Sequence, residues 1–430
     1  MSSCRFDLVV YGVTGITGAL IFEYLVKSEY SSVKYAVAGR SEAKLKTALK
    51  MIGERCGRNL NSTPILIADS SKPETLAAMA KRAKVIINAV GPFRLYGEAV
   101  VKAAIENGAH QIDVAGEPAW IEKMESKYHD LAKEKGVYVV GATGFDSLPC
   151  DLGLHFLKRN FQGDLSHIET VIHPKFGEAG YNFSATTYDS LLLGLSEAKV
   201  DELRNLRKKI MPGKMPFSPF NAPKRPFVSY LKEVDGYVFP FHGADKSIVT
   251  RSQYNDFKEN DTRPVRVDTL YRAQSYWWAK GTLLWLGAIN GLIEYDTLKS
   301  LMKKHPKIFS FHFFTKDGPT RAQLDQASFT YWFIGHGWNE KLPASEQHKT
   351  APDVKVVAKC EGPDPGYFTT AGCVVSSSMT LLEDQKFLPG SGGVFTTASA
   401  FGKTRIYERL ASFGITFNLV TQEKTSKARL

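Results

Sequence analysis

Cysteine is scarce in this chain of 430 residues, which holds five, and no two of them have CxxC spacing. So few and such scattered cysteines exclude a disulfide scaffold or a zinc ribbon and favour a reducing compartment. No His or Cys pair has the spacing of metal ligands, so we expect no metal site. The Gly-xxxx-Gly-Lys-Ser/Thr loop and the Gly-x-Ser-x-Gly motif are also absent, which leaves phosphotransfer and serine hydrolysis without support.

We also expect no secretory signal, because no charged segment followed by an apolar run precedes the first predicted strand. The composition, 43% hydrophobic and 23% charged, excludes a wholly disordered chain, and the length predicts two to three domains.

Positive charge is unevenly distributed. The chain has 55 Lys and Arg against 44 Asp and Glu, a net charge of +11, but residues 1–150 carry only +3 of it. Residues 201–232 hold eight basic and two acidic side chains. No nucleic-acid-binding motif accompanies them, so we expect no nucleic acid, and the remaining alternatives are solvated surface or contact with anionic lipid headgroups.

A glycine-rich turn follows the first apolar run, residues 8–11. The turn is Gly12-Val13-Thr14-Gly15-Ile16-Thr17-Gly18, and an apolar stretch of helical length begins at Ala19. In this context glycines let the backbone approach a pyrophosphate, which the N–H groups and dipole of the helix start attract. A turn without a ligand is the alternative. The residues expected to contact the cofactor here are Gly12, Thr14, Gly15, Ile16, Thr17 and Gly18.

The second predicted strand, residues 33–39, does not end in an acidic residue. NAD-selective folds place Asp or Glu there to bind the ribose 2′-hydroxyl, whereas an Arg accommodates the 2′-phosphate of NADP. Arg40, Ser41 and Lys44 can surround such a phosphate. The sequence therefore predicts NADP(H) rather than NAD(H), with a solvated loop residue as the alternative for Arg40.

Strands and helices continue to alternate up to residue 150. Four further strands are predicted, at 64–68, 85–90, 111–115 and 137–140. Six such units predict an α/β fold, a Rossmann-type doubly wound parallel sheet over residues 1–150, with the cofactor across the carboxyl ends of the strands. Asp69 would then lie near the adenine, and Val90, Gly91 and Pro92 near the nicotinamide ribose.

Further motifs occur at Ala38–Ser41, Asn88–Glu98, Gly116–Pro118, Gly144–Asp151, Gly362–Tyr367 and Gly392–Thr396. Together with the glycine turn they resemble the saccharopine dehydrogenase-like oxidoreductases of animals, over nearly the whole chain. The resemblance implies an oxidoreductase of the type found on lipid droplets and membranes. It does not imply saccharopine turnover, because saccharopine dehydrogenases carry a GxGxxG-type loop and this chain has GxxGxxG.

Hydride transfer requires a proton donor or acceptor near the substrate. Tyr96 follows the fourth strand and Asp146 follows the sixth, so both are catalytic candidates at the binding edge. A packed loop aromatic is the alternative for Tyr96, and a turn or N-cap residue is the alternative for Asp146.

After residue 150 the pattern changes to longer strands, at 168–173 and 354–360. We expect residues 151–394 to form an α+β domain that covers the substrate and dimerises. Residues 395–430 should add one helix and one strand that pack back near the nucleotide domain.

The most unusual segment is residues 276–293, where three aromatic residues precede an uncharged run of 13, Gly281–Ile293. The run is shorter than the roughly 20 residues that span a bilayer. Aromatic and basic flanks fit a helix that lies in a lipid interface, with a core or dimer-interface helix as the alternative. The basic flanks are Arg263, Arg266, Arg272, Lys299, Lys303, Lys304 and Lys307.

We therefore predict an NADP(H)-dependent oxidoreductase that acts on a small lipophilic substrate at a lipid surface. The alternative is a non-catalytic lipid-droplet or membrane-surface protein that retains the dinucleotide-binding fold. We expect it on the cytoplasmic side of a lipid droplet or membrane. Ala428, Arg429 and Leu430 are similar to a peroxisomal address, which makes the peroxisome the alternative localisation.

Overall fold

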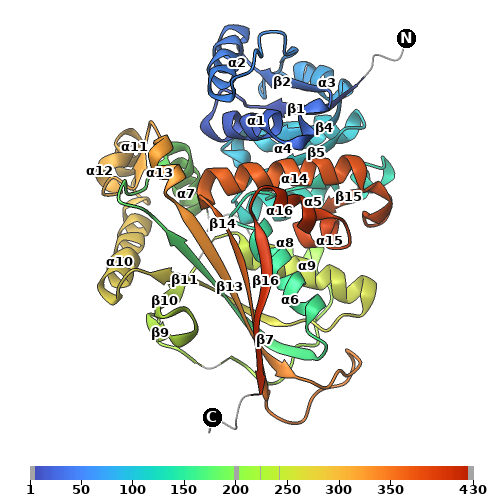
Figure 1. Cartoon of the computed structure of the whole chain (residues 1–430), viewed down its shortest axis with the longest axis vertical. Coiled ribbons are helices and arrows are strands. Elements are labelled where there is room, and N and C mark those ends of the chain that lie inside the picture. The colour runs from blue at the N-terminus through green and yellow to red at the C-terminus, as the bar shows by residue number, and fades with distance from the viewer. Residues whose placement is uncertain (1–4, 198–202, 223, 242, 425–430) are drawn as a thin grey trace.

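The structure is a computed structural model that describes residues 5–197, 203–222, 224–241 and 243–424. Within these ranges the strands form two seven-stranded sheets and one two-stranded ribbon. The first sheet lies in the upper part of Figure 1, and the second, strongly twisted sheet lies below it. The α/β fold with a second α+β part, as predicted, is confirmed.

The first sheet is parallel and has the strand order β15-β6-β5-β4-β1-β2-β3. It contains all six predicted strands and a seventh, as β1 (Phe6–Tyr11), β2 (Tyr35–Gly39), β3 (Ile65–Ile67), β4 (Ala83–Asn88), β5 (His110–Asp113), β6 (Tyr138–Val140) and β15 (Gly393–Phe395). Leu8, Val9 and Val10 are fully buried, as expected for a strand covered on both faces. The order reverses between β1 and β4, which is where doubly wound sheets bind their ligands.

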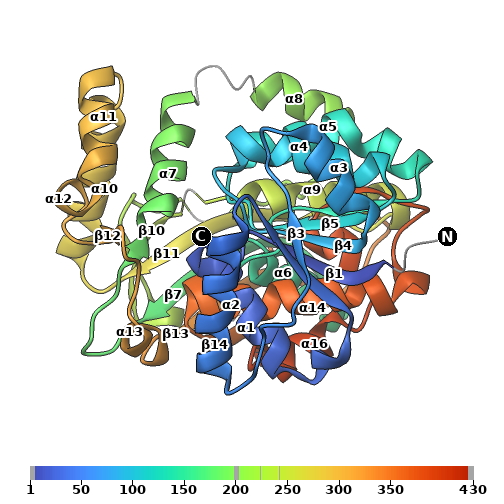
Figure 2. The same ribbon diagram turned by 90° about the horizontal axis from the view of Figure 1, so that it is seen from above.

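Helices cover both faces of this sheet. One face is covered by α3 (Pro73–Lys81), α4 (Phe93–Glu106) and α5 (Pro118–Glu134), and the other by α1 (Ile16–Lys27), α2 (Glu42–Cys56) and α14 (Thr370–Glu383). Figure 2 shows the two helical layers with the sheet between them.

The second sheet is mixed and has the order β16-β14-β13-β7-β11-β10-β9. Its strands are β7 (Asp164–Lys175), β9 (Ser229–Leu231), β10 (Gly236–Pro240), β11 (Arg266–Ala273), β13 (Ser328–Trp338), β14 (Val354–Pro363) and β16 (Thr416–Lys424). The antiparallel arrangement expected for 168–173 and 354–360 is found, because β13 pairs antiparallel with both β7 and β14. Helices α6 (Leu148–Asn160), α9 (Asp245–Asn260), α15 (Thr397–Phe401) and α16 (Ile406–Ser412) complete this part. Helix α8 (Leu203–Ile210) packs on α5, where Arg207 pairs with Glu122.

The division of the chain differs from the expected boundaries. Residue 394 lies inside β15, which pairs parallel with β6 and so belongs to the nucleotide-binding sheet. Helix α14 lies outside residues 1–150 in the sequence, yet it packs on α1 of the nucleotide-binding domain. The strand expected near the nucleotide domain, β16, instead pairs with β14 in the second sheet, because that sheet offers a long antiparallel edge.

A helical cluster projects from the side of the second sheet. It consists of α7 (Ala185–Glu197), α10 (Tyr276–Leu292), α11 (Asp296–Lys304), α12 (Pro306–Phe309), α13 (Arg321–Asp325) and the parallel ribbon of β8 (Phe183–Ser184) and β12 (Phe314–Thr315). Its core joins Tyr188 and Leu192 of α7 to Ile289 of α10 and Met302 of α11. Among the described residues, no helix is both long and apolar enough to cross a membrane.

Candidate cofactor site and active site

The three glycines of the turn have separate geometric roles. Gly12 has φ +103°, and a Cβ there would lie 2.9 Å from Val90 Cγ2. A Cβ on Gly18 would lie 2.3 Å from the Gly12 carbonyl oxygen, so α1 can approach β1 only with glycine at this position. Gly15 is the N-cap of α1, where a Cβ would meet nothing closer than 3.5 Å. The start of α1 is therefore open to a ligand, with Thr14 and Gly15 exposed.

This arrangement fits the pyrophosphate of a dinucleotide, because the unpaired N–H groups and dipole of α1 are directed at an open backbone surface. Thr17 lies in the first turn of α1 and is partly exposed. The side chain of Ile16 lies against Gly318 of the other domain, so a contact between Ile16 and the cofactor would be made by its backbone N–H.

The end of β2 presents a basic surface. Arg40 and Lys44 are exposed, and no carboxylate follows Gly39 directly. Ser41 is the N-cap of α2, and its hydroxyl accepts the N–H of Lys44 at 3.4 Å, which gives it a structural role that the sequence did not predict. Asp69 is close enough to Arg40 to be influenced by it, but its lowered pKa is caused first by the backbone N–H and hydroxyl of Ser71.

A buried carboxylate, that of Glu117, fixes the end of the loop that follows β4. The carboxylate of Glu117 accepts the N–H of Phe93 at 3.0 Å and of Arg94 at 3.1 Å, which fixes the start of α4. Asn88 Oδ1 accepts the N–H of Val90 at 3.1 Å. Val90, Gly91 and Pro92 are therefore fixed at the carboxyl edge of the sheet, where the nicotinamide ribose is expected.

Asp146 lies in the loop between β6 and α6, at the same edge. Its side chain is open to solvent, yet the protein surrounds its carboxylate closely enough for desolvation to raise its pKa. A Cβ on Gly116 would lie 3.2 Å from Asp146 Oδ2, so glycine leaves room for this carboxylate. The loop is anchored by Asp113, which accepts the N–H of Ala142 at 3.0 Å and whose pKa burial raises to about 6.

Behind Asp146 lies a group of buried acids that sequence reasoning missed. Asp245 accepts a hydrogen bond from Tyr331, and burial, followed in part by the charges of Asp146 and Asp151, raises its pKa well above the usual range. Asp151 accepts the hydroxyls of Ser252 and Thr397 at 2.8 Å each and caps α15. Asp245 and Tyr331 come from distant parts of the chain and carry no motif, so no local signal could have found them.

The two catalytic candidates differ in their surroundings. Tyr96 lies in the first turn of α4 with 41% of its surface exposed, and no described contact joins it to Asp146. Asp146 has the raised pKa and the position at the strand ends that a proton donor requires. Within the described residues, no group of His, Cys, Asp and Glu could hold a metal ion.

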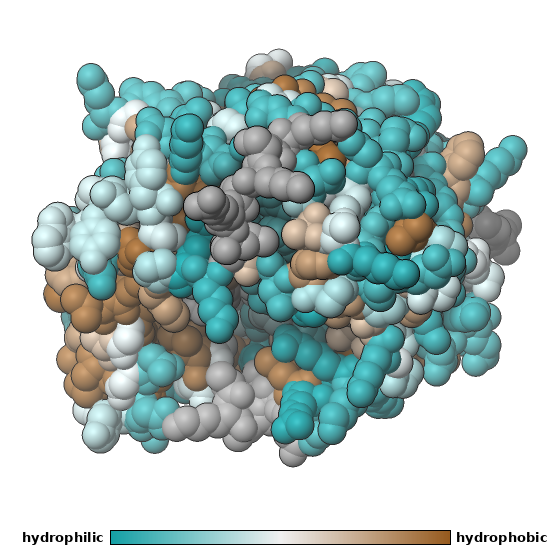
Figure 3. Space-filling view, turned by 90° about the horizontal axis from the view of Figure 1, so that it is seen from below, coloured by the Kyte–Doolittle hydropathy of each residue, from teal (hydrophilic) through white to brown (hydrophobic). Residues whose placement is uncertain are grey.

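The apolar segment forms helix α10, as expected, and it has two different faces. The inner face packs on the protein: Trp278 stacks on Tyr271, and Trp285 donates to the Phe309 carbonyl at 2.7 Å. The outer face is exposed and largely apolar, with Trp277, Gly281, Leu284, Ala288 and Gly291 at helical spacing. It carries one charged residue, the exposed Lys280, whose ammonium lies 5.5 Å from the centre of the Tyr276 ring. Figure 3 shows apolar surface gathered at the left, the side on which α10 lies in Figure 1.

Three of the predicted basic flanks do not face this surface. Arg263 is buried and pairs with Asp164 at 3.1 Å. Arg272 donates to the carbonyls of Val234 and Asp235, and Arg266 donates to that of Ser218. The expectation for these arginines was wrong, because backbone carbonyls and a buried acid occupy their guanidinium groups. Lys299 is half-buried and donates to Ser196, while the basic flanks that remain exposed are Lys303, Lys304 and Lys307.

Comparisons with known proteins agree with this geometry. Residues 8–140 match the saccharopine dehydrogenase NADP-binding domain family, which confirms the preference for NADP(H) predicted from Arg40. A lipid droplet localized protein of Caenorhabditis elegans is 48% identical over 97% of this chain and 99% of its own. A human saccharopine dehydrogenase-like oxidoreductase is 36% identical over 97% of this chain and 98% of its own.

Among solved structures, apo saccharopine dehydrogenase (L-Glu forming) from Saccharomyces cerevisiae has a TM-score of 0.53 at 12% identity, covering 97% of this chain and 99% of that one. This likeness shows a shared fold and no more. The full-length similarity to curated relatives shows that the chain belongs to the saccharopine dehydrogenase-like oxidoreductase family.

Proposed function

We propose that this protein transfers hydride between NADP(H) and a small lipophilic substrate while it is docked on a lipid surface. The observation that carries the chemistry is Asp146, a solvent-open carboxyl with a raised pKa at the edge where the nicotinamide is expected. The observation that supports a lipid surface is the exposed, largely apolar outer face of α10, together with the exposed lysines Lys280, Lys303, Lys304 and Lys307.

In this proposal, different residues of the chain bind the cofactor and transfer the proton. Bound NADP(H) supplies or accepts the hydride. Arg40 holds the 2′-phosphate, and the start of α1 holds the pyrophosphate. In the direction of reduction, the hydride adds to one atom of a C=C or C=O double bond of the substrate. Asp146 gives its proton to the other atom, which gains negative charge. Behind Asp146, burial raises the pKa of Asp245 well above its usual range, although the hydrogen bond from Tyr331 opposes that rise.

The docking surface comprises the outer face of α10 together with α12 and Phe311. Trp277 is 80% exposed, Leu284 75% and Phe311 82%. Phe311 and His312 both have left-handed backbone angles, φ +50° and +69°, which cost energy for bulky residues and hold the phenyl ring outward. Trp and Phe beside Lys are typical of elements that lie in the interface of an anionic phospholipid layer.

The test is NADPH oxidation with α,β-unsaturated and carbonyl compounds of short and long alkyl chain, each with and without phospholipid vesicles. We expect turnover that increases with chain length and with vesicles. Turnover of short, water-soluble compounds alone would contradict the lipophilic substrate. Tight NADPH binding without oxidation by any compound would favour the alternative, a non-catalytic lipid-surface protein. The homodimer stays a prediction, and the C-terminal residues 428–430, on which the peroxisomal alternative depends, lie outside the described residues.

A further inference from the structure

A turn of the second domain lies directly on the start of α1. Residues 316–318 follow the ribbon in which Phe314 and Thr315 pair with Phe183 and Ser184. Gly318 has φ +67°, and a Cβ there would lie 2.4 Å from Ile16 Cδ1. Because Ile16 is the first residue of α1, the turn lies beside the open N–H groups of the glycine turn.

Other contacts fix the turn in this place. Arg321 of α13 donates to the buried carboxylate of Glu23 on α1 at 3.1 Å, and its guanidinium lies 4.7 Å from the centre of the Phe368 ring. Tyr24 of α1 contacts the same ring at 5.7 Å. Ile16 and Glu23 are seven residues apart and therefore lie on one face of α1. The second domain is thus attached along two turns of the helix that begins at the cofactor site.

Lys316 is the basic residue in this turn. Its side chain is exposed, and among the described residues no hydrogen bond or ion pair holds it. Glu23, the acid on the contacted face of α1, is already paired with Lys27, Arg55 and Arg321. The first turn of α1 has no Lys or Arg, so the helix offers the pyrophosphate N–H groups and a dipole but no full positive charge.

We propose that Lys316 binds the pyrophosphate of NADP(H), so that the second domain completes the cofactor site. Its flexible four-carbon side chain starts two residues from the contact with Ile16, and an ammonium group is an effective point charge for phosphate. Asp317, the next residue, is exposed and carries the opposite charge. The proposal concerns cofactor binding and does not depend on the substrate or on turnover.

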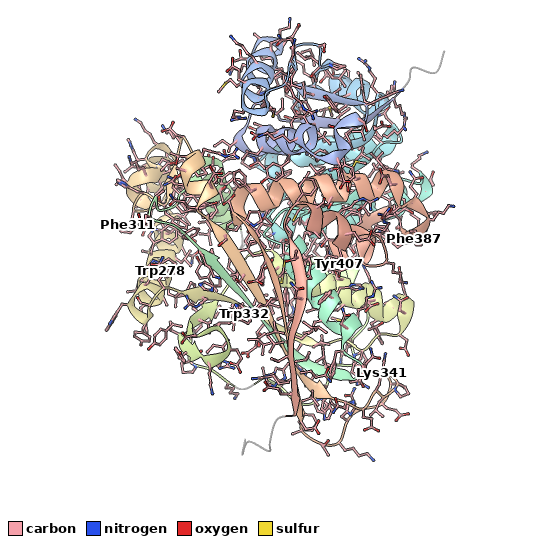
Figure 4. The ribbon with its side chains drawn as sticks, viewed as in Figure 1. Trp278, Phe311, Trp332, Lys341, Phe387 and Tyr407 are labelled. Carbon is pink, nitrogen blue, oxygen red and sulfur yellow. The ribbon has the colours of Figure 1, made fainter. Side chains whose placement is uncertain are left out.

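The experiment is a fluorescence titration of the full chain with NADPH and with NADH, at low and high salt. Both nucleotides contain the pyrophosphate, so Lys316→Met should weaken both about five- to tenfold at low salt, and less at high salt. Arg40→Met should weaken NADPH alone. Lys341→Met is the matched control, because this exposed lysine lies at the opposite end of the molecule (Figure 4), and it should change neither affinity.

Two results would overturn the proposal. Unchanged affinities in Lys316→Met at low salt would show that the side chain does not reach the cofactor. A loss for NADPH alone would place Lys316 at the 2′-phosphate instead. Asp317→Asn gives a further check, since removal of a negative charge from the same turn should leave both affinities equal to or tighter than those of the wild type.

Discussion

Asp146 shows how one side chain acquires its chemistry from groups that are remote in sequence. The loop that carries it is anchored by Asp113, and a glycine at position 116 leaves space for its carboxylate. Crowding by protein raises its pKa, although the side chain remains open to solvent. A carboxyl that keeps its proton at higher pH while a substrate can still reach it has the two properties of a general acid.

Asp146→Asn should lower kcat for substrate reduction by about 10²- to 10⁴-fold, with the affinity for NADPH unchanged, because the amide cannot give up a proton. In the wild type, kcat for reduction should fall as the pH rises through the raised pKa of Asp146, since the proton is lost. The variant should lack this limb of the profile. The measurement is NADPH oxidation as a function of pH, with Tyr96→Phe in parallel; if that variant loses the limb instead, Tyr96 is the donor.

At the scale of the element, helix α10 has features of both alternatives offered for residues 276–293, a core helix and a helix in a lipid interface. Its inner face packs through Trp278, Trp285 and Ile289, as a core helix would. Its outer face exposes Trp277 and Leu284, and the one charged residue between them at helical spacing is Lys280. A helix with both faces apolar is unusual at a protein surface unless something covers the outer one.

The double substitution Trp277→Glu with Leu284→Glu should lower binding to vesicles of phosphatidylcholine and phosphatidylserine at least about tenfold, because two exposed apolar side chains lose their lipid contact. Flotation of the protein with the vesicles measures this. The matched control is Phe387→Glu, since this phenylalanine is 56% exposed on the other side of the molecule (Figure 4) and should not matter. Equal losses in both variants would indicate nonspecific adsorption, and no loss would remove α10 from the docking surface.

At the scale of the whole molecule, the two domains are interleaved rather than consecutive. Helix α14 is buried from Thr370 to Leu381 and packs on α1, and β15 pairs with the edge of β6. The nucleotide-binding sheet therefore obtains part of its core and one edge from residues 370–395, far beyond its last N-terminal strand, which ends at Val140.

A fragment of residues 1–150 should for this reason not fold as a stable unit. It would expose the face of α1 that α14 covers and the open edge of β6, both of which favour aggregation. We expect no cooperative thermal unfolding by circular dichroism and no NADPH binding by the fragment, with the full chain as the control. A soluble fragment that binds NADPH as tightly as the full chain would show that the C-terminal elements are dispensable.

The sequence by itself determined the nucleotide-binding half. Strands, glycine turn and helix starts follow one another within a few residues, so periodicity and the Gly12–Gly18 spacing predicted the fold, and Arg40 predicted NADP(H). These are local properties of the chain, and the parallel sheet that follows from them has few alternative topologies.

Only the tertiary structure decided which polar side chains are engaged by other protein groups and which remain available to bind a ligand. Arg263 was expected to flank a helix on a lipid surface, but it is buried and pairs with Asp164. Ser41 was expected to contact the 2′-phosphate, and folding also makes it the N-cap of α2. Asp245 meets Tyr331 across 86 positions of the chain, and Gly318 meets Ile16 across the domain boundary. Whether a charge is available for a ligand depends on which group folding places beside it, and that proximity is set by packing between distant segments rather than by any pattern along the sequence.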